Sequence, residues 1–489
     1  MGKHFLSVLG TGEYKKAIYS CDGRKVETPY VQEALLKLKF DTWELEDKIS
    51  IFLTEKAKQD NWEDREYRDK EKEAAKHELP ELRKGLKSVL QKDYSVFLDE
   101  AEKCMLPIGA NEEELWEIFQ VIFSRIQENE ELYIDITHSL RNIPIQMLAV
   151  VSYARVLKNV TVKGIYYGAF ETKDQFGGET PILDLVTFLD ILDWSQAANA
   201  FVKYGNSNQI FELYEEQKKK AYKDKMQKGK TQIYQRDLQK VVTEIHNITS
   251  GLETSRGYYD FKENKTNKAT SVMGAYKAYK STFEIMNKKD NEKKERKEKQ
   301  RNIIEPLGEL LKVIDDKAKI FDVESNLDFG LAAVQWAIDN KSTQQGFTAL
   351  EETVKTFLCN YYELDETQQI DREGICKNIC GILYEECCKK QKKNANNFEL
   401  RVQICENWIN KNREVLKITQ EKEEKICRIF KTLPTTLLEI VHEIGNRRNS
   451  MNHFGYSNLG KFSSEKLESD LKLYYKEFQE IMEKMKNEI

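Results

Sequence analysis

Residues 131–141 read ELYIDITHSLR, an apolar run that ends in a cluster of polar side chains. Leucine and isoleucine alternate with less apolar residues up to Ile136, which is typical of a strand. A hydroxyl, an imidazole and a guanidinium follow at once, on Thr137, His138 and Arg141. Such groups can bind phosphate, ribose or a base, although a turn of this kind can also simply cap the next helix.

The segments around this run alternate between strand and helix patterns. Strands are expected at 4–9, 48–54, 131–136 and 160–167, and helices at 30–39, 112–127 and 144–157. This alternation predicts a Rossmann-like α/β fold, in which a parallel sheet is covered by helices on both faces. Ligands bind such sheets beyond the carboxyl ends of the strands, where the loop after 131–136 is expected.

A second loop of this type follows the first predicted strand and reads GTGEY over residues 10–14. A dinucleotide fingerprint would need a third glycine where Lys15 stands, and the sequence contains no GxxxxGK[ST] phosphate loop. A flexible loop with backbone N–H groups and a hydroxyl still suits a phosphate-bearing ligand, without implying chemistry on that ligand.

From residue 199 onward the strand patterns disappear, and seven prolines and 23 glycines among 489 residues agree with long helices. We therefore expect an α/β domain at 1–198 and an all-α domain at 199–489. With 77 basic and 82 acidic residues the formal charge is −5, so any nucleic-acid contact must be local. The Lys-rich runs at 218–230 and 287–301 are expected to be solvated helices or connectors rather than RNA-binding arms.

Nine cysteines without a secretory leader fit a reducing compartment better than a disulfide framework. Cys376, Cys380 and Cys387 recur at helical spacing rather than as a CxxC knuckle, so we expect them in a helical core and predict no metal site. No apolar stretch approaches the ~18 residues that a membrane-spanning helix requires. A cytoplasmic protein without a membrane partner is expected.

Residues 437–455, LLEIVHEIGNRRNSMNHFG, hold the second candidate site. One polar stripe of a predicted helix, with Arg448 within reach, carries His442, Asn446, Asn449 and His453. Imidazole and guanidinium groups suit RNA cleavage without a metal, because one moves the proton of the 2′-hydroxyl and the other stabilises charge on the phosphate. Two such helices in a two-fold dimer would complete the site. Alternatively, His453 caps the helix and the arginines are solvated.

Four motifs occur in the order found in one family: LGTGEY at 9–14, IFLTEKA at 51–57, DITHSLR at 135–141 and PILDLVTFLDILDW at 181–194. Together they resemble the CRISPR-associated proteins that carry a DxTHG motif and an amino-terminal CARF sensor domain. Near the other end, RNSMNH at 448–453 is similar to the RxxxxH motif of HEPN ribonucleases.

The resemblance implies a CARF–HEPN protein of a type III CRISPR antiviral system. Such proteins are homodimers, or higher oligomers of dimers, whose sensor domains bind a cyclic oligoadenylate, here expected to be cyclic tetra-adenylate. Binding activates a metal-independent endoribonuclease that cuts single-stranded RNA non-specifically, and no cofactor is expected. By position, the ligand-binding residues would be Gly10, Thr11, Gly12, Tyr14, Thr137, His138 and Arg141, and the catalytic residues Arg448, Asn449 and His453.

Two alternatives stay open at this point. The chain could be a sensor and regulator whose helical domain binds a partner or nucleic acid without catalysis. The sensor pocket could also cleave its own activator as a secondary activity. Ser139 stands where the motif of the family has glycine, so the ring size of the activator is not given by the motif.

Overall fold

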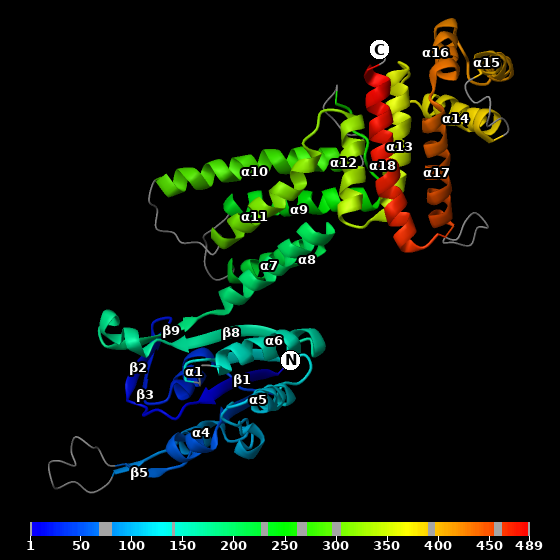
Figure 1. Ribbon diagram of the computed structural model, residues 1–489. Helices are drawn as coiled ribbons and strands as arrows, with labels where there is room; N and C mark the ends of the chain where they lie inside the picture. The colour runs from blue at the N-terminus through cyan, green and yellow to red at the C-terminus, as the bar shows by residue number, and fades with distance from the viewer. Residues whose placement is uncertain are drawn as a thin grey trace. The chain divides into compact units, whose positions relative to one another are not determined.

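The computed structural model describes residues 2–67, 81–138, 142–225, 233–261, 271–295, 305–389, 397–453 and 462–487. The chain divides into two compact units, Met1–Ile191 and Leu192–Ile489. The first unit holds the β-sheet, and the second is helical in its described residues (Figure 1). The boundary between the units and the one expected at 198 both fall within helix α7 (Val186–Tyr204).

A seven-stranded sheet forms the first unit, in the order β3-β2-β9-β8-β7-β1-β4. β1 pairs in parallel with β4 and β7, and β7 pairs in parallel with β8. These four are the predicted strands, which are confirmed. The strands of the sheet are β1 (Lys3–Leu9), β2 (Ala17–Cys21), β3 (Arg24–Thr28), β4 (Lys48–Leu53), β7 (Glu131–Asp135), β8 (Thr161–Gly168) and β9 (Glu179–Asp184), and a separate ribbon pairs β5 (Arg65–Tyr67) with β6 (Glu81–Arg83).

The sheet is mixed, so the prediction of an all-parallel sheet is wrong at one side. β9 runs antiparallel to β8, and β2 and β3 form an antiparallel hairpin. The hairpin turns at Asp22 and Gly23, whose φ angles of 50° and 80° are typical of tight hairpin turns. These strands are five or six residues long, and β3 and β9 contain charged residues. Their alternation of apolar and polar residues is therefore too short to be distinguished from a loop.

Helices cover both faces of the sheet, as predicted (Figure 1). Along β1, Phe5 and Leu9 belong to one core, whereas Leu6 and Val8 belong to the other, because successive side chains of a strand point to opposite faces. α1 (Val31–Lys39) and α4 (Leu86–Tyr94) contribute to the first core, and α5 (Glu112–Arg125) and α6 (Ile143–Leu157) to the second.

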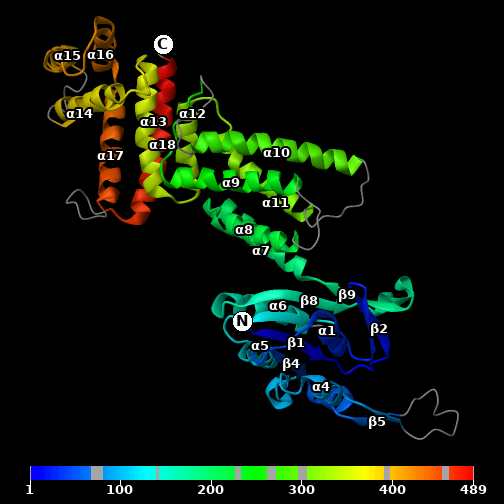
Figure 2. The ribbon, with the colours of Figure 1, turned by 180° about the vertical axis from the view of Figure 1, so that it is seen from behind.

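The described residues of the second unit form helices and turns (Figure 2), as predicted from residue 199 onward. One apolar core joins α7 through α12, and a second joins α12 through α18. The helices after α7 are α8 (Asn208–Lys225), α9 (Ile233–Glu253), α10 (Val272–Glu295), α11 (Glu305–Ala318), α12 (Asn326–Asp339), α13 (Thr343–Tyr361), α14 (Asn378–Leu383), α15 (Phe398–Asn412), α16 (Gln420–Thr432), α17 (Thr435–Asn452) and α18 (Ser464–Asn487), with π-helical turns η5 (Ile370–Lys377) and η6 (Tyr384–Lys389) beside α14.

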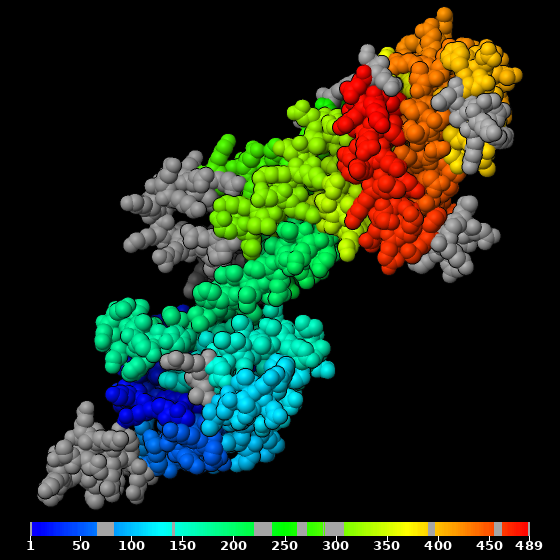
Figure 3. Space-filling view, viewed as in Figure 1, coloured from blue at the N-terminus to red at the C-terminus, as the bar shows by residue number. Residues whose placement is uncertain are grey.

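α13, α17 and α18 pack against one another in the second core, and Figure 3 shows α18, in red, along α17, in orange. Cys376, Cys380 and Cys387 are buried in this core, which confirms their prediction as small apolar core residues. Parts of the Lys-rich runs lie outside the described residues, namely 226–230 and 296–301. Among the described helices, none combines the length and the hydropathy that a membrane crossing requires.

Candidate functional site

The loop after β1 is folded back on itself. The Tyr14 hydroxyl accepts a hydrogen bond from the Gly10 N–H at 2.9 Å. The Asn61 side chain donates to the carbonyl oxygens of Gly10 and Gly12, each at 2.9 Å. Burial raises the pKa of Tyr14, so its hydroxyl stays protonated. The loop therefore has a defined shape, with Thr11 and Gly12 exposed at its tip.

A buried carboxylate ties the second loop to the sheet. Asp135, at the end of β7, accepts hydrogen bonds from Ser7 Oγ on β1 at 2.7 Å, and from the backbone N–H and the hydroxyl of Thr137 at 3.0 and 2.6 Å. The Thr137 hydroxyl accepts in turn from the Gly168 N–H at the end of β8, at 2.8 Å. The Thr137 hydroxyl thus donates a hydrogen bond to Asp135 on β7 and accepts one from Gly168 on β8. It therefore joins the carboxyl ends of two neighbouring strands.

His138 connects the two loops. Its ring lies edge-on to the ring of Tyr14, with 4.4 Å between the centroids. Its Nε2 atom is buried and has no hydrogen-bond partner among the described residues. Burial lowers the pKa of His138 and raises the pKa of Asp135, so the imidazole is neutral near pH 7. A buried nitrogen without a partner indicates a group that a ligand can satisfy.

The fold therefore brings together three residues of the predicted ligand site, namely Gly10, Tyr14 and His138. A Cβ atom on Gly10 would lie 3.4 Å from the His138 Cβ and 3.4 Å from the Tyr14 hydroxyl, so Gly10 lies close to side chains of both loops. Gly12 has open space around it, and nothing in the packing requires glycine there. Arg141, like Ser139, lies outside the described residues.

Three side chains that shape this edge of the sheet were not predicted. Besides Asn61, Arg83 on β6 donates to the Tyr14 carbonyl, and Gln32 on α1 donates to Ser7 Oγ at 3.1 Å. They come from segments that are distant from the loops in the sequence. None of them belongs to a phosphate- or nucleotide-binding pattern. The position of Asn61, four residues after the IFLTEKA motif, is a sequence signal that could have indicated it.

Replacing Asn61 by Ala should loosen the loop after β1, because two hydrogen bonds to its carbonyl groups are lost. We expect the free energy of unfolding to fall by about 1–3 kcal/mol and amide exchange at residues 10–14 to become faster. Hydrogen exchange followed by mass spectrometry checks this. Gln59→Ala is the control, since Gln59 is exposed and bonds Glu55. Equal exchange in Asn61→Ala and wild type would contradict the prediction.

The second candidate site lies at the carboxyl end of α17. Asn449 and His453 are exposed about one turn apart, and the His453 backbone N–H donates to the Asn449 carbonyl at 3.0 Å. His442, predicted on the same polar stripe, stacks on Tyr384 with 3.8 Å between the ring centroids. The structure therefore presents Asn449 and His453 to solvent and uses His442 in packing.

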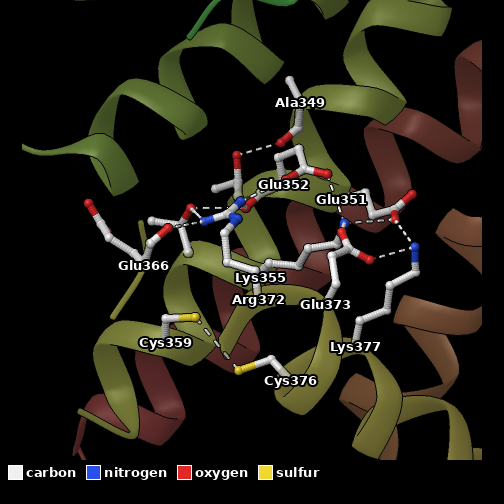
Figure 4. A network of polar contacts seen from close by, with 12 residues as sticks. Ala349, Glu351, Glu352, Lys355, Cys359, Glu366, Arg372, Glu373, Cys376 and Lys377 are labelled. Atoms are coloured by element: carbon white, nitrogen blue, oxygen red, sulfur yellow. Dashed lines mark hydrogen bonds and ion pairs between the residues drawn. The ribbon is translucent and has the colours of Figure 1, made fainter. Parts of the chain in front are cut away.

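Arg448 is held by an ion pair rather than solvated as the alternative supposed. Its Nη1 atom lies 2.9 Å from Glu351 Oε2 on α13. Glu351 Oε1 lies 3.1 Å from Lys355 Nζ and 3.4 Å from Lys377 Nζ, in a network that Figure 4 shows. Burial opposes the charge of Glu351, yet Lys355 and Arg448 hold the pKa of this carboxyl below its ordinary value. The charged carboxylate, which the sequence did not indicate, fixes the direction of the guanidinium.

The neighbouring Arg447 links α17 to α18. Its Nε atom donates to Asp470 at 3.0 Å, it also pairs with Glu443, and its guanidinium lies 4.0 Å from the centroid of the Phe462 ring. Its side chain is 10% exposed, against 26% for Arg448. Arg447 is thus part of the packing between helices, which favours Arg448 as the arginine available to a substrate.

Replacing Arg447 by Ala should destabilise the protein far more than replacing Arg448 by Ala. The first change leaves the buried Asp470 with Lys466 as its remaining cation, at an expected cost of about 3 kcal/mol. The second leaves Glu351 paired with Lys355 and Lys377, at an expected cost of about 1 kcal/mol. Urea denaturation of both variants checks this, and equal losses would mean that Arg448 is as structural as Arg447.

Comparisons with known proteins match two parts of the chain. Residues 4–171 match the family described as CRISPR system endoribonuclease Csx1, CARF domain. Residues 190–284 match the second domain of CRISPR-associated protein MJ1674. The MJ1674 protein of Methanocaldococcus jannaschii is 28% identical over 293 residues, which are 59% of this chain and 38% of that relative. The chain thus matches well under half of the length of this relative.

These matches define the class of protein. The first unit is a CARF domain related to that of Csx1, and a domain like the second domain of MJ1674 follows it. The chain therefore carries a CARF domain similar to that of a CRISPR-associated endoribonuclease, followed by a region that is largely helical in its described residues. Helix α17, with the second candidate site, lies outside the residues that these two families match.

Proposed function

We propose that this protein is an endoribonuclease of a type III CRISPR antiviral system, switched on by a cyclic oligoadenylate that two CARF domains bind together. It cuts single-stranded RNA by metal-independent attack of the 2′-hydroxyl at a HEPN site formed by two copies of α17. The observation that carries the proposal is the presence, on one chain, of a CARF domain and of an exposed His453 beside an anchored Arg448.

The end of α17 supplies the groups that RNA cleavage needs. The 2′-oxygen attacks phosphorus, the bond from phosphorus to the 5′-oxygen breaks, and a cyclic phosphate remains. The exposed imidazole of His453 can take the 2′-hydroxyl proton or return a proton to the leaving oxygen. Arg448, which Glu351 orients, stabilises the added negative charge. Each chain has one such imidazole, so two chains supply the base and the acid.

The loops at residues 10–14 and 137–138 lie at one edge of the sheet, which we call the sensor edge. This edge suits a ligand with phosphates and bases. The exposed tip of the first loop offers a hydroxyl on Thr11 and a backbone without a side chain at Gly12. The unpartnered Nε2 of His138 can bond a base or a ribose hydroxyl. A cyclic tetra-adenylate has two-fold symmetry, so two copies of these loops can grip it in the same way.

α6 supports the pairing of two chains. Ile145, Leu148, Tyr153 and Val156 are 74%, 38%, 48% and 82% exposed, on the face opposite to the one that covers the sheet. A helix that is apolar on both faces is typical of a buried position, and an exposed apolar face marks an interaction site. Because α6 begins just after the His138 loop, a second copy of α6 on this face would bring the two sensor loops close to the symmetry axis.

Replacing His453 by Ala should abolish RNA cleavage, because the imidazole that moves the proton is lost, with an expected loss of about 10²–10⁴-fold. The measurement is cleavage of a fluorescent RNA in the presence of cyclic tetra-adenylate. His442→Ala is the matched control, since His442 lies on the same helix but stacks on Tyr384.

Activator binding, measured by calorimetry, should be equal in wild type and His453→Ala. Cleavage should also survive EDTA. If His453→Ala cleaves RNA as fast as wild type, the catalytic site does not lie on α17. If wild type binds the activator but cleaves no RNA, the protein is a sensor and regulator without catalysis.

Replacing Ile145 and Val156 together by Glu should dissociate the dimer, because two buried charges on a two-fold axis would repel their symmetry mates. Sedimentation velocity should then show monomers and activator affinity should fall. Val96→Glu is the control, because Val96 is 76% exposed in the same domain but not on α6. Monomeric wild-type protein, or an unchanged dimer in the double variant, would contradict this interface.

A further inference from the structure

The helical unit contains a cavity of about 720 Å³ between α9, α12 and α13. Its walls include Gly251 at the end of α9, Phe329 and Trp336 on α12, and Thr348 and Glu352 on α13. None of the residues predicted for the two candidate sites lines it. A cavity of this size suits a small organic molecule, with the aromatic rings as its apolar wall.

The charges around the cavity do not suit a phosphate ligand. Three carboxylates line it, on Glu253, Glu352 and Glu366, against two guanidinium groups, on Arg256 and Arg372. The formal charge of the lining is therefore −1, which disfavours an anion. This separates the cavity from the sensor edge, whose proposed ligand carries phosphates.

Two of the donor groups at the wall are already used within the protein. The terminal nitrogens of Arg372 donate four hydrogen bonds, to Thr356 Oγ1, the Glu366 carbonyl, the Glu352 carbonyl and Glu352 Oε2, at 2.7–3.1 Å. The Thr353 hydroxyl donates to the Ala349 carbonyl at 2.6 Å, which leaves its oxygen as an acceptor. A ligand that brings its own N–H or O–H donors is therefore favoured.

A continuous polar network leads from this cavity to Arg448. Arg372 bonds Glu352, Glu352 lies 2.8 Å from Lys355 Nζ, and Lys355 lies 3.1 Å from Glu351 (Figure 4). Glu351 in turn holds Arg448. The Lys355 side chain is 5% exposed and so depends on these carboxylates for its charge. A ligand that moves Glu352 therefore changes the contacts of Lys355, which also pairs with Glu351.

We propose that the cavity is a second effector site, which takes an uncharged, flat heterocycle with amino or hydroxyl donors, such as a purine nucleoside, and alters the position of Arg448. The control of RNA cleavage rests on the proposed function, whereas the binding does not. Linkage requires the effect to be reciprocal, so occupancy of the α17 site also changes the affinity of the cavity.

The binding test uses the full-length protein with adenosine and guanosine as probes, and AMP and cyclic tetra-adenylate as anionic comparisons. We expect calorimetry to show one nucleoside per chain, and Tm to rise with nucleoside concentration. AMP should bind more weakly than adenosine. If neither nucleoside binds at millimolar concentration, or if AMP binds better than adenosine, the proposal is overturned.

Two variants fill the cavity from α13, Thr348→Phe and Gln345→Phe, and each should abolish nucleoside binding. The matched control is Asn360→Phe, the same new side chain at an exposed position of the same helix that does not line the cavity. Tm of each variant without nucleoside reports folding. Wild-type affinity in both filled variants would place the bound nucleoside elsewhere and overturn the site.

The coupling test adds nucleoside to RNA cleavage assays of wild type and Glu352→Gln. We expect the nucleoside to change the cleavage rate of wild type by about fivefold or more. The Glu352→Gln protein should cleave at the same rate with and without bound nucleoside. Hydrogen exchange at residues 444–453 reads the same coupling without cleavage, so it decides the matter even if the protein cuts no RNA. Binding that leaves both readouts unchanged would overturn the effector role.

Discussion

The sensor edge depends on the hydrogen bonds that the carboxylate of Asp135 accepts. This carboxylate is buried at the end of β7 and accepts hydrogen bonds from Ser7 and Thr137, while Thr137 accepts from Gly168. A buried carboxylate without such donors would cost several kcal/mol. The ends of β1, β7 and β8 are therefore held in one register, and the contact between Tyr14 and His138 follows from that register.

The same constraint acts in the helical unit, where buried charges must be paired. Lys355 is surrounded by Glu351, Glu352 and Glu373, and Glu351 reaches across to Arg448 on α17. α13 thereby joins two regions, since one of its faces lines the cavity and the adjoining face orients Arg448. Changes on one side of α13 have a direct polar route to the other.

Much of the fold could be predicted because local periodicity reflects which side chains are buried. The runs at 4–9 and 131–136 are apolar over enough residues to identify strands, and their loops meet because parallel strands end at the same edge of a sheet. The strands of the β2–β3 hairpin are too short for this, so the mixed character of the sheet was missed. Asn61 was missed because its partners are about fifty residues away in the sequence.

The sequence alone determined which reactive groups exist and placed them on the right elements, because a helix or strand follows from neighbouring residues. The RxxxxH motif favoured Arg448, but the helical pattern could not show which of Arg447 and Arg448 is buried, since adjacent residues of a helix differ only in direction. Their partners, Asp470 and Glu351, are 23 and 97 residues away, and only the packing of α18 and α13 against α17 assigns one arginine to the core and the other toward solvent. The tertiary structure also decided where the cavity lies, because its walls come from helices that no local pattern connects.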